Sequence, residues 1–281
     1  MSGFRRFNHA NESSCIGSYP LQSAQSAFNV PARHNGYPSM TGYAKPIVAL
    51  DVPTSGDAIA LARVLGDACR FYKVGSTLFT AAGPRIVRDL REELGADVFL
   101  DLKFHDIPNT VAGAVRSAAG LGAKLVTVHA SGGRAMLEAA QAAAGTECGV
   151  LAVTVLTSLD GAALASSWGR GALDVQEEVL RLAGDAVAVG VHGIVCSGEE
   201  AESVRRVFGD RLAVLVPGVR LEGDAANDQA RVVTPRSAQR AGARYVVVGR
   251  TVTAAADPRL AFRRVQADLA ADTPQWVTPV G

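Results

Sequence analysis

The chain has 281 residues and a mass of 29.1 kDa, a size that suits one large globular domain or two small ones. Its 28 Lys and Arg residues balance 27 Asp and Glu residues, so the net charge of +1 gives no general attraction to nucleic acid or to an anionic membrane surface. The longest apolar stretch, residues 186–196, is too short to cross a bilayer. An anionic ligand must therefore be bound by a local cluster of cations.

The two ends of the chain differ from its middle. Residues 1–44 are rich in Ser, Asn, Gly and Tyr, carry Glu12 as their only acid and show no periodicity, which predicts a disordered extension. We further hypothesise that translation starts at Met40, because the first strand-like run follows it closely. Residues 271–281 are expected to be a C-terminal tail. The expected domain is therefore 45–270.

The pattern of cysteines predicts in which cellular compartment the protein is located. Cys15, Cys69, Cys148 and Cys196 are far apart, with no C-x-x-C pair and no histidine at metal-ligand spacing. We expect reduced thiols, no metal site and a cytoplasmic location. The sequence shows no pattern of a secretory signal, which would be a positively charged start followed by an apolar stretch and a cleavage site.

From residue 46 onward, short apolar runs alternate with helix-length segments. Because the runs are almost continuously apolar, they predict parallel strands buried on both faces. The eight runs are 46–50, 71–74, 97–100, 125–129, 149–155, 193–196, 213–216 and 245–248. Apolar residues at helical spacing predict helices within 84–94 and 199–208, each followed by a glycine.

Eight such units match the size of a (β/α)8 barrel, which is typically roughly 250 residues long. The long interval after the fifth run, which includes Trp168, is expected to hold an inserted loop or an extra helix. An open doubly wound sheet also alternates strands and helices, but no G-x-G-x-x-G follows the first run. The α/β class with a (β/α)8 barrel is the predicted fold.

In such a barrel the chemistry is located at the carboxyl ends of the strands. A polar residue ends or follows every run: Asp51, Lys73, Asp101 with Lys103, His129, Thr157, Ser197, Arg220 and Arg250. Each of them alone is explained as a helix cap or a satisfied loop residue. Together they would converge on one rim, which favours a functional site.

The densest cluster is residues 101–106 (DLKFHD). Residues two apart on a strand point to the same side, so Asp101 and Lys103 are expected to form a pair, with Lys73 beside Asp101 on the neighbouring strand. A lysine kept protonated by carboxylates can act as a general acid. Asp106 lies farther along and could serve a neighbouring subunit. Charge alone does not distinguish this arrangement from a structural ion-pair network.

A second cluster follows the eighth run. Gly249 and Arg250, with the start of a helix expected within 252–256, are typical of a phosphate site, and barrels often bind phosphate after strands seven and eight. The loop after the seventh run, with Arg220 and Gln229, is long and polar enough to fold over a phosphate.

These motifs resemble the orotidine 5'-phosphate decarboxylase family, in the subgroup typical of many bacteria. The resemblance extends from about residue 46 to residue 269, and its most specific part is residues 101–110 (DLKFHDIPNT). Further matches are residues 49–51 (ALD), 72–75 (YKVG), 155–158 (VLTS), 217–220 (PGVR), 228–229 (DQ) with 234–235 (TP), and 248–250 (VGR).

The resemblance implies a cofactor-independent homodimer that converts orotidine monophosphate to uridine monophosphate in pyrimidine synthesis. Lys103 would be the proton donor to C6, and Asp101 would face the substrate carboxylate. The remaining roles are ribose binding by Asp51 and Lys73, contact with the partner subunit's site by Asp106 and Thr110, pyrimidine contact by Thr157 or Ser158, and phosphate binding by Arg220, Gln229, Gly249 and Arg250.

Two alternatives remain at this point. Related barrels that share D-x-K-x-x-D act on sugar phosphates with Mg²⁺, but they place a glutamate ligand where this sequence has Lys73, and a cation there would repel Mg²⁺. A non-catalytic, nucleotide-binding barrel would tolerate loss of Asp101 or Lys103, yet both are present.

Overall fold

A computed structural model of the chain describes residues 42–224 and 233–271. The elements within these ranges run from Lys45 to Ala270. The predicted extension at residues 1–44 therefore lies almost wholly outside the described residues, as do Met40, Gln229 and nearly all of the predicted tail.

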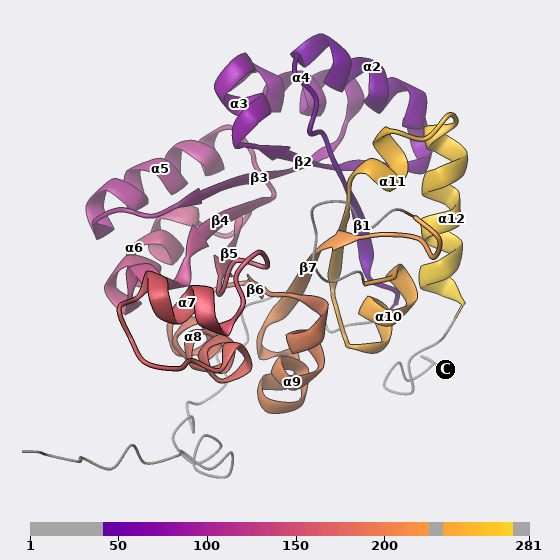
Figure 1. The fold of residues 1–281 in the computed structure, drawn as a ribbon. Coiled ribbons are helices and arrows are strands. Elements are labelled where there is room, and N and C mark those ends of the chain that lie inside the picture. Colours follow the sequence, from indigo (N-terminus) through magenta and orange to yellow (C-terminus); the bar gives the residue numbers. More distant parts are fainter. Residues whose placement is uncertain (1–41, 225–232, 272–281) are drawn as a thin grey trace, which may run out of the picture. The chain divides into compact units, whose positions relative to one another are not determined.

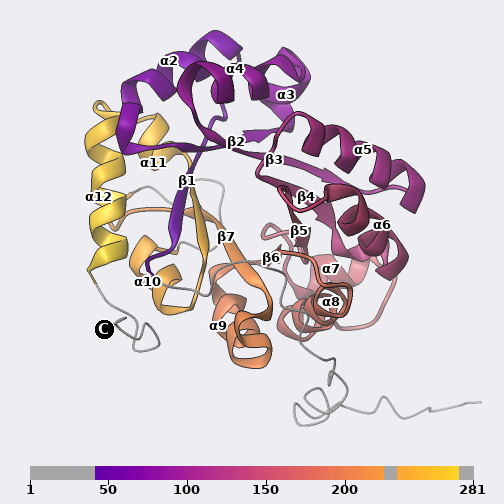
Figure 2. The same ribbon diagram turned by 180° about the vertical axis from the view of Figure 1, so that it is seen from behind.

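Eight parallel strands form a closed barrel in which each strand pairs with the next and β8 pairs with β1. This confirms the predicted (β/α)8 fold. Figure 1 shows the ring of strands with the helices around its outside, and Figure 2 shows the same arrangement from behind. The strands are β1 (Lys45–Ala49), β2 (Phe71–Gly75), β3 (Asp97–Phe104), β4 (Leu125–His129), β5 (Gly149–Val153), β6 (Gly193–Val195), β7 (Ala213–Val219) and β8 (Tyr245–Val248).

Helices connect the strands, and the last long helix packs beside the first (Figures 1 and 2). The α-helices are α2 (Ser55–Leu65), α3 (Ser76–Ala82), α4 (Arg85–Leu94), α5 (Pro108–Gly120), α6 (Arg134–Ala144), α7 (Gly161–Ser167), α8 (Val175–Val189), α9 (Gly198–Phe208), α10 (Pro235–Arg240), α11 (Arg250–Thr253) and α12 (Pro258–Ala270). Short 3-10 turns are η1 (Gly66–Ala68), η2 (Ala130–Gly132) and η3 (Gly209–Arg211). Helix α7 is the extra element expected near Trp168.

The strands are apolar on both sides because both sides are buried. One set of side chains fills the barrel interior, and the residues between them face the helices. The interior cluster consists of Ile47, Ala49, Phe99, Leu125, Leu151, Val153, Val195, Ala213, Leu215, Tyr245 and Val247. On β6, a Cβ at Gly193 would lie 2.0 Å from the carbonyl oxygen of Ala213, so only glycine lets β6 and β7 approach this closely.

Two strands extend at least three residues beyond their predicted apolar runs. Strand β3 continues from Leu100 to Phe104, and β7 continues from Val216 to Val219. Both extensions contain a register shift against the neighbouring strand, at which the regular pairing is interrupted. The polar residues of β3 therefore lie on the strand itself and not in a following loop. Helix α11 also begins earlier than expected, at Arg250.

A buried histidine lies within the described barrel, where Nε2 of His192 is 3.1 Å from the Tyr245 hydroxyl. Burial, together with the positive charges of Arg244 and Lys124, lowers the pKa of His192 to about 3.

Among the described residues, no helix is both long enough and apolar enough to cross a membrane.

The pKa of His192 predicts an acid-sensitive stability. The unfolded chain binds a proton at this histidine below its ordinary pKa of 6.5, whereas the folded chain keeps the ring neutral down to about pH 3. Acid therefore favours unfolding, and this group alone should remove about 1.4 kcal/mol of stability per pH unit between pH 6 and pH 4. Urea unfolding of the wild type and of His192→Gln over this range measures the effect. The variant should show the shallower pH dependence, and equal slopes would contradict the prediction.

Candidate active site

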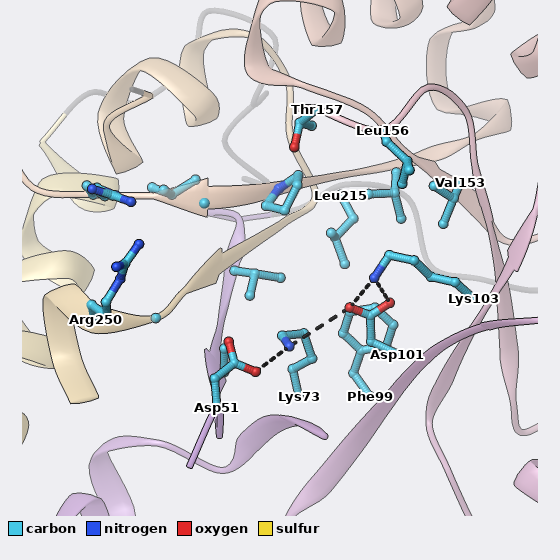
Figure 3. A pocket seen from close by; sticks show the side chains of 18 of the residues that line it. Asp51, Lys73, Phe99, Asp101, Lys103, Val153, Leu156, Thr157, Leu215 and Arg250 are labelled. Atoms are coloured by element: carbon cyan, nitrogen blue, oxygen red, sulfur yellow. Dashed lines mark hydrogen bonds and ion pairs between the residues drawn. The ribbon is translucent and has the colours of Figure 1, made fainter. Parts of the chain in front are cut away.

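A cavity of about 500 Å³ opens at the carboxyl ends of the strands (Figure 3). Side chains from several strand ends and from the loops after them line it. The residues predicted for the site that line the cavity are Asp51, Lys73, Asp101, Lys103, Thr157, Arg220, Gly249 and Arg250. Four charged groups gather at one part of the cavity, and Arg250 lies apart from the Asp101–Lys103 pair.

Strand alternation explains why these residues enter the cavity. On β1, the interior residues Ile47 and Ala49 are followed two positions later by Asp51, just beyond the strand. On β3, Phe99 is followed two positions later by Asp101, and Lys103 enters the cavity from the irregular part of the strand before Phe104. The polar rim of the cavity is therefore the direct continuation of the apolar barrel core.

Four charged side chains alternate in sign along the cavity floor. Nζ of Lys103 lies 2.8 Å from both oxygens of Asp101. Nζ of Lys73 lies 3.9 Å from Oδ2 of Asp101 and 2.9 Å from Oδ1 of Asp51. Figure 3 shows the row from Asp51 through Lys73 and Asp101 to Lys103. Each ammonium group thus lies beside at least one carboxylate.

Burial divides this row into a centre and two ends. The side chains of Asp101 and Lys73 are 13% and 12% exposed, whereas those of Lys103 and Asp51 are 38% and 64% exposed. A nearly buried carboxylate requires charged or hydrogen-bonding partners, and Asp101 has both lysines. The more accessible Lys103 can meet a ligand while it remains fixed to Asp101.

Gly75 leaves room for the Lys73 side chain. A Cβ at this position would lie 3.0 Å from Nζ of Lys73 and 3.5 Å from Oδ1 of Asp51. The first contact is tight, so Nζ of Lys73 would have to shift by a few tenths of an ångström. The glycine at the end of β2 therefore belongs to the geometry of the charged row, although it carries no functional group.

The backbone of β3 is unusual where it carries the lysine. Lys103 has φ of 51°, which is the only positive value outside glycine among the described residues. Such a conformation is strained for a long side chain and requires support from its surroundings. The backbone N–H of Lys103 donates to the Thr127 hydroxyl at 2.9 Å.

Two histidines lie near the same strand ends. The rings of His105 and His129 have centroids 5.2 Å apart. Burial, with contributions from His105 and Lys103, lowers the pKa of His129. His129 therefore stays neutral at neutral pH and adds no positive charge beside Lys103. No chemical role was predicted for either histidine, and neither lines the cavity.

The arginines of the site come from the last two strands. Arg220, which is 7% exposed, follows β7, and Arg250 begins α11 directly after β8. The backbone at Arg220 is anchored, because its N–H donates to the carbonyl of Val233 at 3.0 Å. Two guanidinium groups and the open space at Gly249 make this part of the cavity suitable for an anion such as phosphate.

Apolar side chains form a further part of the lining, which the sequence reasoning did not identify. Val153, Val155, Leu156 and Leu215 line the cavity, and Leu156 is one of the exposed large apolar residues (Figure 3). Such a surface can contact the face of a planar ring. Residues 155–158 (VLTS) match the family motif, but the resemblance implies a role only for Thr157 or Ser158 and none for Val155 and Leu156.

Three predicted site residues are not among the residues that line this cavity in the described part of the chain. Asp106 and Thr110 are exposed and do not line it, while Gln229 lies outside the described residues. The carboxylate of Asp106 accepts a hydrogen bond from the N–H of Ile107, which immediately precedes α5. Ser158, the second candidate for pyrimidine contact, is exposed and also does not line the cavity.

Fold and site together define a (β/α)8-barrel protein with a charged cavity at the carboxyl ends of its strands. Residues 44–265 match the model of the orotidine 5'-phosphate decarboxylase / HUMPS family. Since this match covers most of the chain, the chain belongs to that family.

Named relatives support the same assignment. The orotidine 5'-phosphate decarboxylase of Halorhodospira halophila is 50% identical over 236 residues, covering 83% of this chain and 99% of the relative. That of Anaeromyxobacter sp. strain K is 52% identical, covering 79% and 96%. The crystal structure of the enzyme from Lactobacillus acidophilus has 35% identity and a TM-score of 0.71, covering 81% of this chain and 99% of its own. The expectation of a carboxy-lyase is confirmed by these relatives.

Proposed function

We propose that this protein converts orotidine 5'-monophosphate to uridine monophosphate and carbon dioxide, with Lys103 as the proton donor. The observation that carries the proposal is the pairing of Lys103 with the nearly buried Asp101 inside a cavity that also holds Arg220 and Arg250. The match with this chain covers 99% and 96% of two relatives that are named orotidine 5'-phosphate decarboxylase. A reactive ammonium group and an anion-binding region are the two parts that this reaction requires.

Each part of the substrate has a matching region of the cavity. Its phosphate pairs with Arg220 and Arg250 beside Gly249. Gln229, which is not among the described residues, is proposed to bind the phosphate as well. Its ribose hydroxyls bind to Asp51 and Lys73, which already form an ion pair. Its pyrimidine lies against the apolar lining near Thr157.

The chemistry follows from where charge develops. When the bond between C6 and the carboxylate breaks, the electron pair stays on C6, and no ring carbonyl is placed to delocalise it. A preorganised ammonium group is then the strongest stabiliser available. Lys103 transfers a proton to C6 to complete uridine monophosphate and afterwards regains a proton from water.

Asp101 has two functions in this scheme. It holds the ammonium groups of Lys103 and Lys73, and it faces the carboxylate that will leave. Repulsion between the two carboxylates is relieved as neutral carbon dioxide departs. Binding of the distant phosphate offsets the cost of bringing them together.

The sugar-phosphate alternative conflicts with the position of Lys73. The ammonium group of Lys73 lies between Asp51 and Asp101, where its positive charge would repel Mg²⁺. The binding-only alternative gives no reason for the complete charged row. Lys73 therefore counts against the metal-dependent reaction, and the complete charged row counts against simple binding.

The working form in this proposal is a homodimer in which Asp106 and Thr110 reach the partner's site. Both residues are exposed at the β3–α5 connection, as is Ile107 between them. An exposed large apolar residue beside polar groups suits a subunit interface. We also place the protein in the cytoplasm, because Cys69, Cys148 and Cys196 are unpaired, buried thiols.

The reaction itself is tested by following ultraviolet absorbance when EDTA-treated protein is mixed with orotidine monophosphate. We expect rapid conversion by the wild type and a decrease in kcat of at least about 10³-fold in Lys103→Ala, because the donor and the cation at C6 are lost together. Uridine monophosphate should still bind to the variant. Lys124→Ala is the matched control: this exposed lysine directly precedes β4, does not line the cavity and should be replaceable without loss of activity. No conversion by folded wild type would reject the reaction, and retained turnover in Lys103→Ala would reject the donor.

The phosphate region is tested by Arg250→Ala. Loss of charge-assisted hydrogen bonds should weaken binding of uridine monophosphate about 10- to 100-fold, while binding of uridine, which has no phosphate, should change little. Isothermal titration with both ligands measures the difference. Arg259→Ala, an exposed arginine outside the cavity, should leave both affinities unchanged. An equal loss for the two ligands would argue against phosphate binding by Arg250.

The dimer is tested by mixing two variants that are each inactive, Lys103→Ala and Asp106→Ala. If Asp106 acts in the partner's site, a mixed dimer has one site with both residues intact. Random exchange of equal amounts should then restore about a quarter of the wild-type sites. If Asp106 acted within its own subunit, every site would lack one residue, and the mixture would stay inactive after subunit exchange.

A further inference from the structure

Thr127 lies beneath the charged row, in the middle of β4. It is fully buried and does not line the cavity. Its hydroxyl oxygen accepts the backbone N–H of Lys103 at 2.9 Å, and the same hydroxyl donates to Oδ1 of Asp101 at 3.0 Å. One side chain thus contacts both members of the Asp101–Lys103 pair, at the backbone of one and the carboxylate of the other.

The irregular pairing of β3 with β4 explains why this hydroxyl is needed. Leu100 pairs with Val126 and Phe104 with Val128, so three residues of β3 lie opposite Thr127 alone. A bulge of this kind interrupts the ladder of backbone hydrogen bonds, and a buried N–H without a partner is costly. Thr127 supplies the partner for Lys103 at the point where that residue adopts its positive φ.

The direction of the two hydrogen bonds follows from their chemistry. A backbone N–H can only donate, so the hydroxyl accepts from Lys103 and has its own proton available for Asp101. Oδ1 of Asp101 then receives both the Thr127 hydroxyl and the Lys103 ammonium group. This fixes the rotation of the carboxylate and thereby the position of Nζ of Lys103.

We propose that Thr127 is a positioning residue for the decarboxylation, which holds the backbone of Lys103 and the carboxylate of Asp101 in register. The inference rests on the proposed function. It adds a residue that acts only through these two, since its hydroxyl does not reach the cavity. Catalytic groups displaced by about 1 Å can lose about 100-fold in rate, so the effect should appear in kcat and not in nucleotide binding.

The test compares Thr127→Val, which keeps the shape but removes the hydroxyl, with Thr127→Ser, which keeps the hydroxyl. We expect Thr127→Val to lower kcat about 10- to 100-fold, with KM and the affinity for uridine monophosphate within about twofold of the wild type. Thr127→Ser should recover most of the loss. Unchanged kcat in Thr127→Val, or a Thr127→Ser variant as slow as Thr127→Val, would overturn the proposal.

Thr154→Val is the matched control. Thr154 is also a buried threonine, its hydroxyl donates to the carbonyl of Val195 at 2.9 Å, and it does not line the cavity. Thr154→Val should lower the melting temperature about as much as Thr127→Val does, but it should leave kcat unchanged. If both variants lost kcat equally, general destabilisation would explain the result, and the positioning role would be wrong.

A crystal structure of Thr127→Val keeps this inference separate from the proposed reaction. The structure should show the Asp101 carboxylate rotated and its contact with Nζ of Lys103 lengthened from 2.8 Å. An unchanged pair would overturn the positioning role, whatever the enzyme's substrate. Failure of the wild type to convert orotidine monophosphate would instead reject the reaction alone.

Discussion

The arrangement of the site depends on one nearly buried carboxylate. A carboxylate at this depth requires charged or hydrogen-bonding partners, and Asp101 has Lys103, Lys73 and the Thr127 hydroxyl, which come from three neighbouring strands. Each partner is fixed in turn by its strand. The same interaction that makes the buried charge tolerable also aims the ammonium group of Lys103 into the cavity.

Closure of the barrel brings this charged row into one cavity with the arginines. Asp51 follows the first strand, whereas Arg250 follows the eighth, and these two strands pair because the sheet closes on itself. Residues about 200 positions apart in the chain therefore line the same cavity. A substrate with a reacting ring at one part and a phosphate at another can use the binding of the second to position the first.

The sequence predicted the fold well because its dominant signal is local. Eight nearly continuous apolar runs, separated by helix-length segments, are typical of strands buried on both faces, and the structure has a strand at each of them. The prediction failed at the ends of β3 and β7, where polar and glycine residues continue the strand through a register shift. Strand ends of this kind are set by pairing with a neighbour, which a single run does not reveal.

The sequence by itself determined the class of fold, the family and the types of residue at the strand ends, because two-residue alternation carries the core pattern into the rim. Only the tertiary structure decided the contacts among them: the positive φ of Lys103, the bridge made by Thr127 and the apolar lining that includes Leu156. In the sequence, Thr127 does not differ from other residues of a buried strand, and its role follows only from the irregular pairing of β3 with β4. Which side a residue faces is a local property of the strand, but what it touches depends on register, and register is fixed only when the barrel closes.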